Sequence, residues 1–387
     1  MIRALHGFVV DPAMADRVVA PVAEKLSGDD RTRILSENPD NSLRLLAETP
    51  ADRADARAYL DRVIQDGTYH PTEGWWAYRI TDGDHRQTGV IAEVAVEAYE
   101  SNRIRRHENT VAEVATHVAD TLEQVRGSSH PVSLLYRRLP AVEEIIGPAT
   151  VQAPAIRVER GSRIQEAWPL PDAAALQEAL ESIPTLYIAD GHHRTSGAAA
   201  LASRRGASAP DHAAYFLAAL FPADQMRTLS YHRCLHLPDH SPGEILAVIA
   251  RHFTLEPIPL PPGPHGVPDP GHVWVHGDGS WYDLELAHGP DAGPTAGLDP
   301  SRLQYQILGP ICDVADPRTD PRLNYIPGTV PFAELAGRCS EQSGITFVTR
   351  PPTVDDVIAV SDAGGVMPPK STWFTPKLGA GIFLRVL

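Results

Sequence analysis

The stretch from Leu186 to Thr195 constrains the fold of this 387-residue chain more than any other part of its sequence. The apolar run from Leu186 to Ala189 is typical of a short buried strand. Asp190 and Gly191 interrupt this run, and the Ala-rich residues 196–204 that follow have the composition of a helix. The sequence therefore predicts a strand, a tight turn and a helix in direct succession.

The predicted turn has the properties of an anion-binding site. The first turn of a helix exposes unpaired N–H groups and a partial positive charge. His192, His193 and Arg194 add donors and cationic charge at the same place. Cations oppose the helix dipole there, and a bound phosphate would relieve that cost. In the alternative interpretation, Asp190 only caps the helix and the histidines are solvated polar residues.

Composition narrows the class of protein. The formal net charge of -15 argues against a surface that coats nucleic acid, and no apolar segment is long enough to span a bilayer. The length allows two or three domains. Cys234, Cys312 and Cys339 are odd in number, widely spaced and without a CxxC pair. We therefore expect neither a disulfide framework nor a zinc site. The same cysteine usage favours a reducing, cytoplasmic location.

Periodicity and turn residues predict further elements. The strongest hairpin signal is the pair of strands 75–80 and 87–96 around the turn Thr81 to Asp84. The other predicted elements are helices at 51–65, 111–122 and Asp172 to Leu180, strands at 131–136 and 213–221, a hairpin of 153–158 with 163–168, and a terminal strand at 383–386.

Glu108 is a candidate catalytic carboxylate. It lies in Ile104-Arg-Arg-His-Glu-Asn-Thr110, just before the predicted helix at 111–122. A metalloprotease HExxH motif would require a histidine at position 111, where the chain has Val111, so that interpretation fails. Two interpretations remain open: Glu108 is a first-turn acid favoured by the helix dipole, or it is a general base.

Two later segments carry polar residues of undecided role. His232 and Arg233 either face a pocket or merely end a strand. Lys370, Ser371 and Thr372 follow two prolines and form a rigid polar loop, which is either exposed or a clamp for a carboxylate or phosphate. The loop is not a Walker A motif, because the GxxxxG before the lysine is missing.

Three motifs in this order resemble those of a bacterial family of unknown function related to the ParB-like free serine kinases. They are IRRHENT at 104–110, YIADGHHRTSGAAA at 187–200 and DAGGVMPPKSTWFTPKL at 362–378. Shorter matches, NPDNSLRLL at 38–46, QTGVIA at 87–92 and SYHRCL at 230–235, extend the resemblance over most of the chain. One departure is Thr195, where relatives often have a tyrosine.

The resemblance implies a role for each matching residue. Glu108 would act as base toward the acceptor hydroxyl, Asp190 would lie near Mg²⁺ and the reacting hydroxyl, and His193 would also be catalytic. The nucleotide phosphates would contact Gly191, His192, His193, Arg194 and Thr195. The small substrate would contact Arg106, His107, His232, Arg233, Lys370, Ser371 and Thr372.

The resemblance also implies a fold and a function. The fold would be α+β (mixed α/β), with a ParB/sulfiredoxin-like nucleotide-binding core and additional α/β domains. We expect an N-terminal α+β segment at 1–100, the core at 101–235, a second α/β domain at 236–350 and a C-terminal segment at 351–387 that returns to the site.

The implied activity is a Mg²⁺-dependent transfer of a phosphoryl group from ATP or ADP to the hydroxyl of a free amino acid. L-serine, giving O-phospho-L-serine, is the first expectation, and another amino alcohol stays open. The expected partners are a nucleotide and a small amino acid rather than nucleic acid or membrane, and a homodimer is compatible with this interpretation. The alternatives are a non-catalytic nucleotide-binding regulator and, more remotely, sulfiredoxin-type chemistry, for which no cysteine adjoins the turn.

Overall fold

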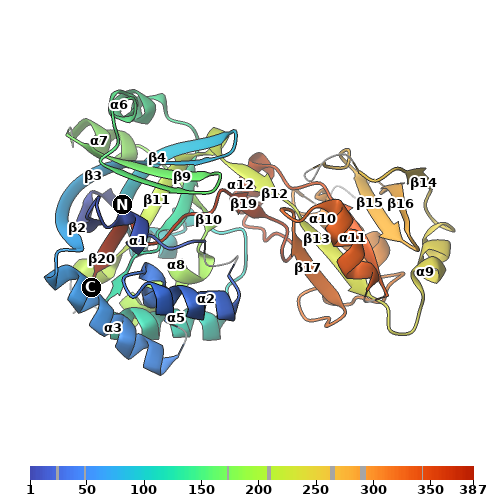
Figure 1. Cartoon of the computed structure of the whole chain (residues 1–387). Helices are drawn as coiled ribbons and strands as arrows, with labels where there is room; N and C mark the ends of the chain where they lie inside the picture. Colours follow the sequence, from blue (N-terminus) through green and yellow to red (C-terminus); the bar gives the residue numbers. More distant parts are fainter. Residues whose placement is uncertain are drawn as a thin grey trace. The chain divides into compact units, whose positions relative to one another are not determined.

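The computed structural model describes residues 1–22, 26–47, 49–171, 174–206, 211–261, 266–287, 293–341 and 343–387. The chain forms two compact units (Figure 1). The first contains Met1–Met226 and Pro376–Leu387, and the second contains Arg227–Thr375. Residues 1–100 and the predicted core up to Met226 thus share one unit, and the C-terminal segment is divided between the two units at Pro376.

The first unit is built on one large mixed sheet. Its strands are β1 (Ile2–Arg3), β2 (Leu5–Val10), β3 (Tyr69–Asp82), β4 (His85–Ala95), β5 (Ile104–Arg105), β6 (Gly127–Ser128), β7 (Val132–Tyr136), β8 (Ile156–Arg160), β9 (Arg163–Leu170), β10 (Leu186–Asp190), β11 (Tyr215–Pro222) and β20 (Phe383–Val386). The main path through the sheet is β5-β10-β7-β11-β4-β3-β2-β20-β6, while β9 pairs with β3 and with β8. The predicted hairpins are confirmed as β3–β4 and β8–β9, and the terminal strand is confirmed as β20.

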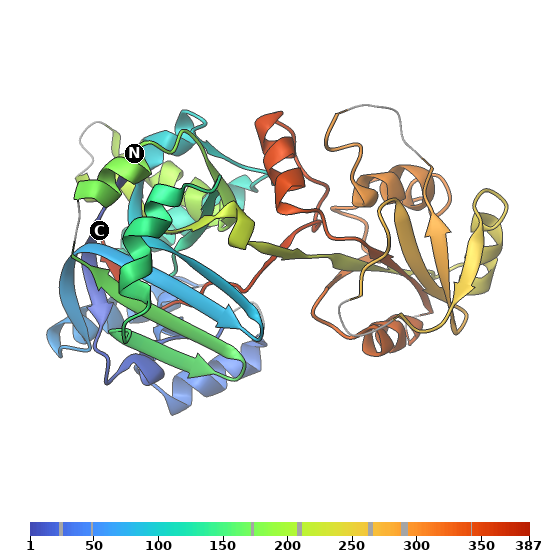
Figure 2. The same ribbon diagram turned by 90° about the horizontal axis from the view of Figure 1, so that it is seen from above.

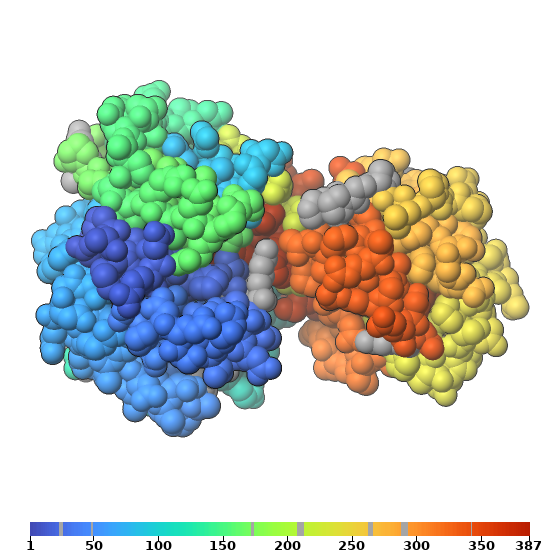
Figure 3. Space-filling view, in the orientation of Figure 1, coloured from blue at the N-terminus to red at the C-terminus, as the bar shows by residue number. Residues whose placement is uncertain are grey.

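Helices cover this sheet on both sides (Figures 1 and 2). They are α1 (Ala15–Val18), α2 (Gly28–Glu37), α3 (Pro50–Gln65), α4 (Val96–Glu100), α5 (Ala112–Val125), α6 (Pro140–Thr150), α7 (Ala174–Glu181) and α8 (His192–Arg205). Figure 1 places α3, α5 and α8 together on one side of the sheet and α6 with α7 on the other. The predicted cap of α7, Asp172, lies outside the described residues. In Figure 3 the N-terminal segment (blue) and the segment from α6 to β9 (green) form much of the visible surface of this unit.

The core of the first unit lies between the sheet and its helices. Val90, Leu134, Ile188 and Leu220 from neighbouring strands are all fully buried in it. On one side α5 and α8 approach closely, because Gly197 lacks a Cβ atom that would lie 2.4 Å from Cγ1 of Val118. This contact fixes α8, and with it the turn at Asp190, against the rest of the unit.

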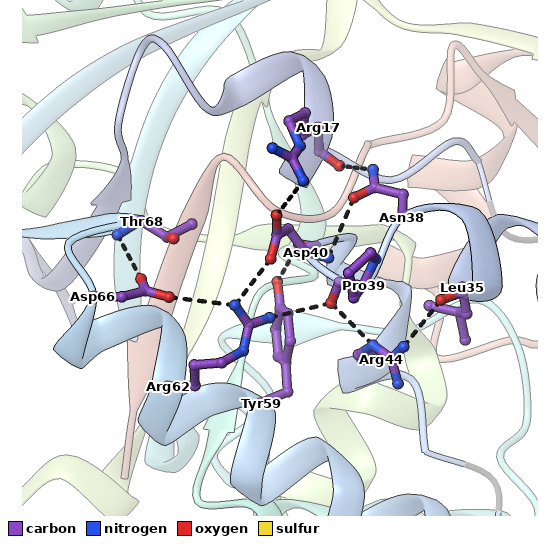
Figure 4. Close-up of polar contacts among 10 residues, drawn as sticks. All are labelled: Arg17, Leu35, Asn38, Pro39, Asp40, Arg44, Tyr59, Arg62, Asp66 and Thr68. Atoms are coloured by element: carbon purple, nitrogen blue, oxygen red, sulfur yellow. Dashed lines mark hydrogen bonds and ion pairs between the residues drawn. The ribbon is translucent and has the colours of Figure 1, made fainter.

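The NPDN segment joins three N-terminal elements through polar contacts (Figure 4). Asp40 is 8% exposed and accepts from Arg17 at 2.7 Å and from Arg62 at 2.9 Å. The hydroxyl of Tyr59 donates to the carbonyl of Asp40 at 2.7 Å, and Nδ2 of Asn38 donates to the carbonyl of Arg17 at 2.6 Å. This motif therefore stabilises the packing of α1 and α3 around the turn after α2.

The second unit contains an antiparallel sheet and four α-helices among its described residues. The sheet order is β14-β16-β15-β18-β13-β17. Its strands are β13 (Tyr231–His236), β14 (Leu255–Ile258), β15 (His272–Gly277), β16 (Ser280–Glu285), β17 (Leu323–Pro327) and β18 (Gly344–Thr349), and a separate pair is β12 (Arg227–Leu229) with β19 (Trp373–Thr375). The helices are α9 (Pro242–Ile249), α10 (Asp299–Leu303), α11 (Phe332–Ser340) and α12 (Val354–Asp362). No helix in the described part of the chain combines the length and apolar character required to cross a membrane.

The expectation that the cysteines form no disulfide framework was wrong for one pair. Cys234 on β13 and Cys339 on α11 form a disulfide, with their Cα atoms 5.7 Å apart, and both residues are buried. They are separated by 105 residues, so the pairing arises only when α11 packs beside β13 and β18, which sequence spacing does not reveal. Cysteine usage therefore does not support a reducing compartment. Cys312 is a free, buried thiol.

We predict that this disulfide stabilises the second unit. Reductant should lower its free energy of unfolding by about 2–5 kcal/mol, because a crosslink over so long a loop restricts the unfolded chain. Urea denaturation with and without dithiothreitol measures the effect. Cys312→Ala should respond to reductant like the wild type, whereas Cys234→Ala/Cys339→Ala should not respond. Three reactive thiols in the unreduced, denatured protein would contradict the pairing.

Candidate functional site

The turn between β10 and α8 has the predicted order, but the helix begins earlier than the sequence indicated. The register of β10 against β7 shifts between Ile188 and Asp190, an irregularity of the kind that redirects side chains at the end of a strand. Gly191 has φ +100°, and α8 begins at the next residue, His192. The two histidines and Arg194 therefore belong to the first helical turn.

Gly191 allows Arg194 to fold back over the turn. A Cβ atom at Gly191 would lie 2.8 Å from Nε of Arg194 and 3.1 Å from its Cζ. The hydroxyl of Thr195, which is fully buried, donates to the carbonyl of Gly191 at 3.1 Å. Thr195 thus stabilises the start of the helix, and its predicted contact with a nucleotide stays a prediction.

Asp190 is held between two cations. Nζ of Lys377 donates to Oδ1 of Asp190, and Nη2 of Arg194 donates to Oδ2. The side chains of Asp190 and Lys377 are only 16% and 12% exposed. Burial alone would raise the pKa of Asp190, but the charges of Lys377 and Arg194 hold it well below its usual range. Asp190 is therefore ionised, and it is not the helix cap, because the N-cap of α8 is Gly191 and no side chain caps it.

Lys377 was not among the residues predicted from the sequence. It lies in the same C-terminal motif as the predicted Lys370, seven positions later and after Pro376. Lys377 belongs to the first unit and Lys370 to the second. The signal that could have identified it is the second proline-lysine pair in the motif, Pro376-Lys377. His130, also absent from the predicted set, lies close enough to Arg194 and Asp190 to interact with their charges.

The two histidines of the motifs pack against each other inside the unit. The rings of His107 and His192 meet edge to face, with centroids 4.5 Å apart, and the residues are 1% and 6% exposed. Burial lowers the pKa of His107 to about 4 and that of His192 well below its usual value. Both rings are therefore neutral at pH 7, and His107 has little surface left for its predicted contact with substrate.

Glu108 provides an accessible carboxylate beside these rings. Its side chain is 37% exposed, and its Oε2 lies 3.8 Å from Nδ1 of His192. Because His192 is neutral and the separation exceeds hydrogen-bond length, this contact is not an ion pair. The acid in the first turn of α5 is Glu113, so Glu108 is not the dipole-stabilising residue of the alternative interpretation.

Two further predicted residues lie in the first unit. His193 is half-buried in α8, and Arg106 is exposed.

The remaining predicted residues lie in the second unit. His232 and Arg233 are buried on β13, where Nη1 of Arg233 donates to the carbonyl of Tyr231 at 2.8 Å. Burial lowers the pKa of Arg233 to about 10. Lys370 is exposed, with its Nζ 5.4 Å from the centre of the Tyr231 ring. Ser371 and Thr372 are buried, and the predicted substrate contacts of these five residues stay predictions.

The turn does not fit Mg²⁺ as a ligand set of its own. Mg²⁺ is usually held by one or two carboxylates together with substrate phosphates. Both oxygens of Asp190 are already bonded to cations, and the described residues contain no group of three or more histidine, cysteine or acidic side chains suited to a metal. The geometry instead places protein cations where the resemblance implied a metal.

Comparison with known proteins identifies the family. Residues 2–302 match the model of the family described as "Protein of unknown function (DUF1015)". The chain belongs to this family. None of the curated proteins matches the sequence. The DUF1015 assignment agrees with the motif resemblance at the level of a family of unknown function.

Similarity to solved structures is weak. A free serine kinase in complex with AMP has a TM-score of 0.39 and 10% identity, covering 78% of this chain and 94% of that one. A mutant free serine kinase in complex with ADP has a TM-score of 0.40 and 10% identity, covering 78% and 95%. SbnI with a C-terminal truncation, from Staphylococcus aureus, has a TM-score of 0.40 and 13% identity, covering 74% and 82%. TM-scores of this size do not establish a common fold.

We predict that Lys377 stabilises the first unit by compensating Asp190. Lys377→Met should lower the free energy of unfolding by about 3–5 kcal/mol, because it leaves a largely buried carboxylate with one cation in place of two. Urea denaturation measures the change. Lys370→Met, at an exposed position of the same motif, should have little effect. Equal stability of the two variants would contradict this role.

We also predict a pH dependence from His107. Its pKa is depressed in the folded state, so the unfolded chain binds a proton first as the pH falls from 6.5 toward 4, and stability is lost in that window. When the pH falls from 7.5 to 5, this histidine should lower the free energy of unfolding by about 2 kcal/mol. His107→Gln should reduce the difference in unfolding free energy between the two pH values, whereas the exposed His6→Gln should preserve it. An unchanged difference in the first variant would show that His107 is not the group responsible.

Proposed function

We propose that this DUF1015 protein is a phosphotransferase that binds ATP or ADP at the Asp190–Arg194 turn. The phosphoryl group passes to the hydroxyl of a small amino acid, with L-serine as the first candidate. The proposal rests above all on one observation, the pair of cations, Lys377 and Arg194, gathered at the N-terminus of α8. It is further supported by the accessible carboxylate of Glu108 beside His192 and by the motif resemblance.

Phosphoryl transfer needs little covalent chemistry from a protein. It requires that donor and acceptor be positioned in line and that positive charge surround the transferred group. The N–H groups at the start of α8, a helix of 14 residues, point to the turn and favour an anion there. Lys377 and Arg194 add two cations at the same position. These groups would hold the donor phosphates and stabilise the charge that develops on them.

Glu108 is the proposed general base. The acceptor oxygen forms a bond to phosphorus while the bond from phosphorus to the bridging oxygen of the nucleotide breaks. The hydroxyl proton passes to the carboxylate of Glu108, and the shortened nucleotide leaves with the electron pair. The neutral ring of His192 lies beside Glu108 and adds no positive charge that would weaken this base.

Phosphorus NMR tests the proposed reaction directly. The protein is incubated with ATP or ADP and a panel of amino acids, with and without Mg²⁺, and the spectrum is followed for a new phosphomonoester. A product with serine is the expected result. Nucleotide binding without any product, in either metal condition, would instead favour a regulator.

The role of Glu108 has a matched control on the same segment. Glu108→Gln should lower kcat about 100-fold or more, because a positioned base typically contributes that much, while ADP affinity is retained. Glu113→Gln changes an exposed carboxylate in the first turn of α5 and should leave kcat unchanged. Product formation by Glu108→Gln at the wild-type rate would rule out the assigned base.

A further inference from the structure

A cavity of about 240 Å³ lies within the first unit beside the turn. Its lining includes residues of α5, α8 and β11, together with residues 45–47 and parts of β6, β7 and β20. Apolar side chains dominate the wall, among them Leu122, Val132, Leu201 and Phe216. The two helices whose close contact fixes the turn, α5 and α8, therefore also contribute to the cavity wall.

The polar groups of the cavity select against a cationic ligand. The described residues that line it include His130 and Arg194, together with His117 and Thr121, whose side chains already bond Arg53. None of these described lining residues is an aspartate or glutamate. Burial lowers the pKa of His130 to about 3, so its ring is neutral at pH 7, and because the ring already bonds the backbone of Leu378, one ring nitrogen is left for a ligand. The ammonium group of a free amino acid would find no carboxylate here. An uncharged ring with donors and acceptors suits this lining.

Arg194 joins the cavity to the proposed phosphate site. It lines the cavity, and its Nη2 donates to Asp190. Its other terminal nitrogen, Nη1, is buried and has no hydrogen-bond partner in the described part of the chain. A buried donor on a cation is costly unless it is satisfied, and an anionic group would satisfy it. A ligand that places an anion at Arg194 can therefore extend its uncharged part into the cavity.

The volume is appropriate for a two-ring heterocycle. An apolar cavity of about 150 Å³ holds benzene, and this one is larger. We propose that the cavity binds the nucleoside of the donor, with the purine base among the apolar side chains and the phosphates at Arg194. This inference rests on the proposed function, since it takes the occupant to be the nucleotide donor.

Filling the cavity tests the assignment. Ala198 lines it from α8, and Ala198→Leu would occupy part of its space. The unfolding temperature should stay the same or rise, because the added carbons enter empty volume. Ser203→Leu adds a similar apolar side chain at an exposed position of the same helix and serves as the matched control. Titration calorimetry with ADP and with tripolyphosphate then separates base recognition from phosphate recognition.

The expected result is that Ala198→Leu weakens ADP binding about tenfold or more but leaves tripolyphosphate binding unchanged. Ser203→Leu should bind both like the wild type. If the wild type and Ala198→Leu bind ADP equally, the cavity is not the nucleoside site, although the proposed function survives. If ADP binds as expected but no phosphomonoester forms, the cavity is still the nucleoside site, whereas the proposed phosphotransferase activity is contradicted. Absence of ADP binding by the wild type would overturn both.

Discussion

The ionic contact of Asp190 with Lys377 and Arg194 connects three parts of the first unit. Asp190 ends the buried strand β10, Arg194 lies in the first turn of α8, and Lys377 begins the C-terminal segment that leads to β20. Because these side chains are largely buried, each charge needs its partners to offset the loss of hydration. The contact thus fixes the end of the strand, the start of the helix and the return of the chain at one point.

Much of this arrangement could be predicted from the sequence because its signals are local. The apolar run of β10, the break at Gly191 and the Ala-rich body of α8 are contiguous, and each has the expected conformation. The hairpin of β3 and β4 was predicted for the same reason. The start of α8 at His192 was missed because polar residues at helix ends give no periodic signal. The register shift before Asp190 depends on β7, which lies about 50 residues away in the sequence.

The features that could not be predicted depend on tertiary packing. Cys234 and Cys339 are brought together by α11 and β13, and their spacing alone suggested unrelated thiols. Lys370 and Lys377 share a motif and a residue type, yet Lys377 lies in the first unit and bonds Asp190, whereas Lys370 belongs to the second unit. His107 is adjacent to Glu108 in the motif, but one side chain is buried and the other is accessible. Adjacent residues in a conspicuous motif can therefore have different structural roles.

Charge balance at the turn determines how an anion can bind there. The chain carries a net charge of -15, so the concentration of Lys377 and Arg194 at the positive end of α8 is local. In the absence of a bound anion, the carboxylate of Asp190 partly compensates the charges of Lys377 and Arg194 and the positive end of the helix dipole. Under the proposed function, a bound phosphate shares these two cations with Asp190, and it also meets the N–H groups at the start of α8 and Nη1 of Arg194, which is buried without a partner in the described chain. Because Asp190 already neutralises part of this charge, the net free energy of anion binding is smaller than the two cations alone would suggest. In the proposed function, recognition of the uncharged part of the nucleotide then provides much of the affinity.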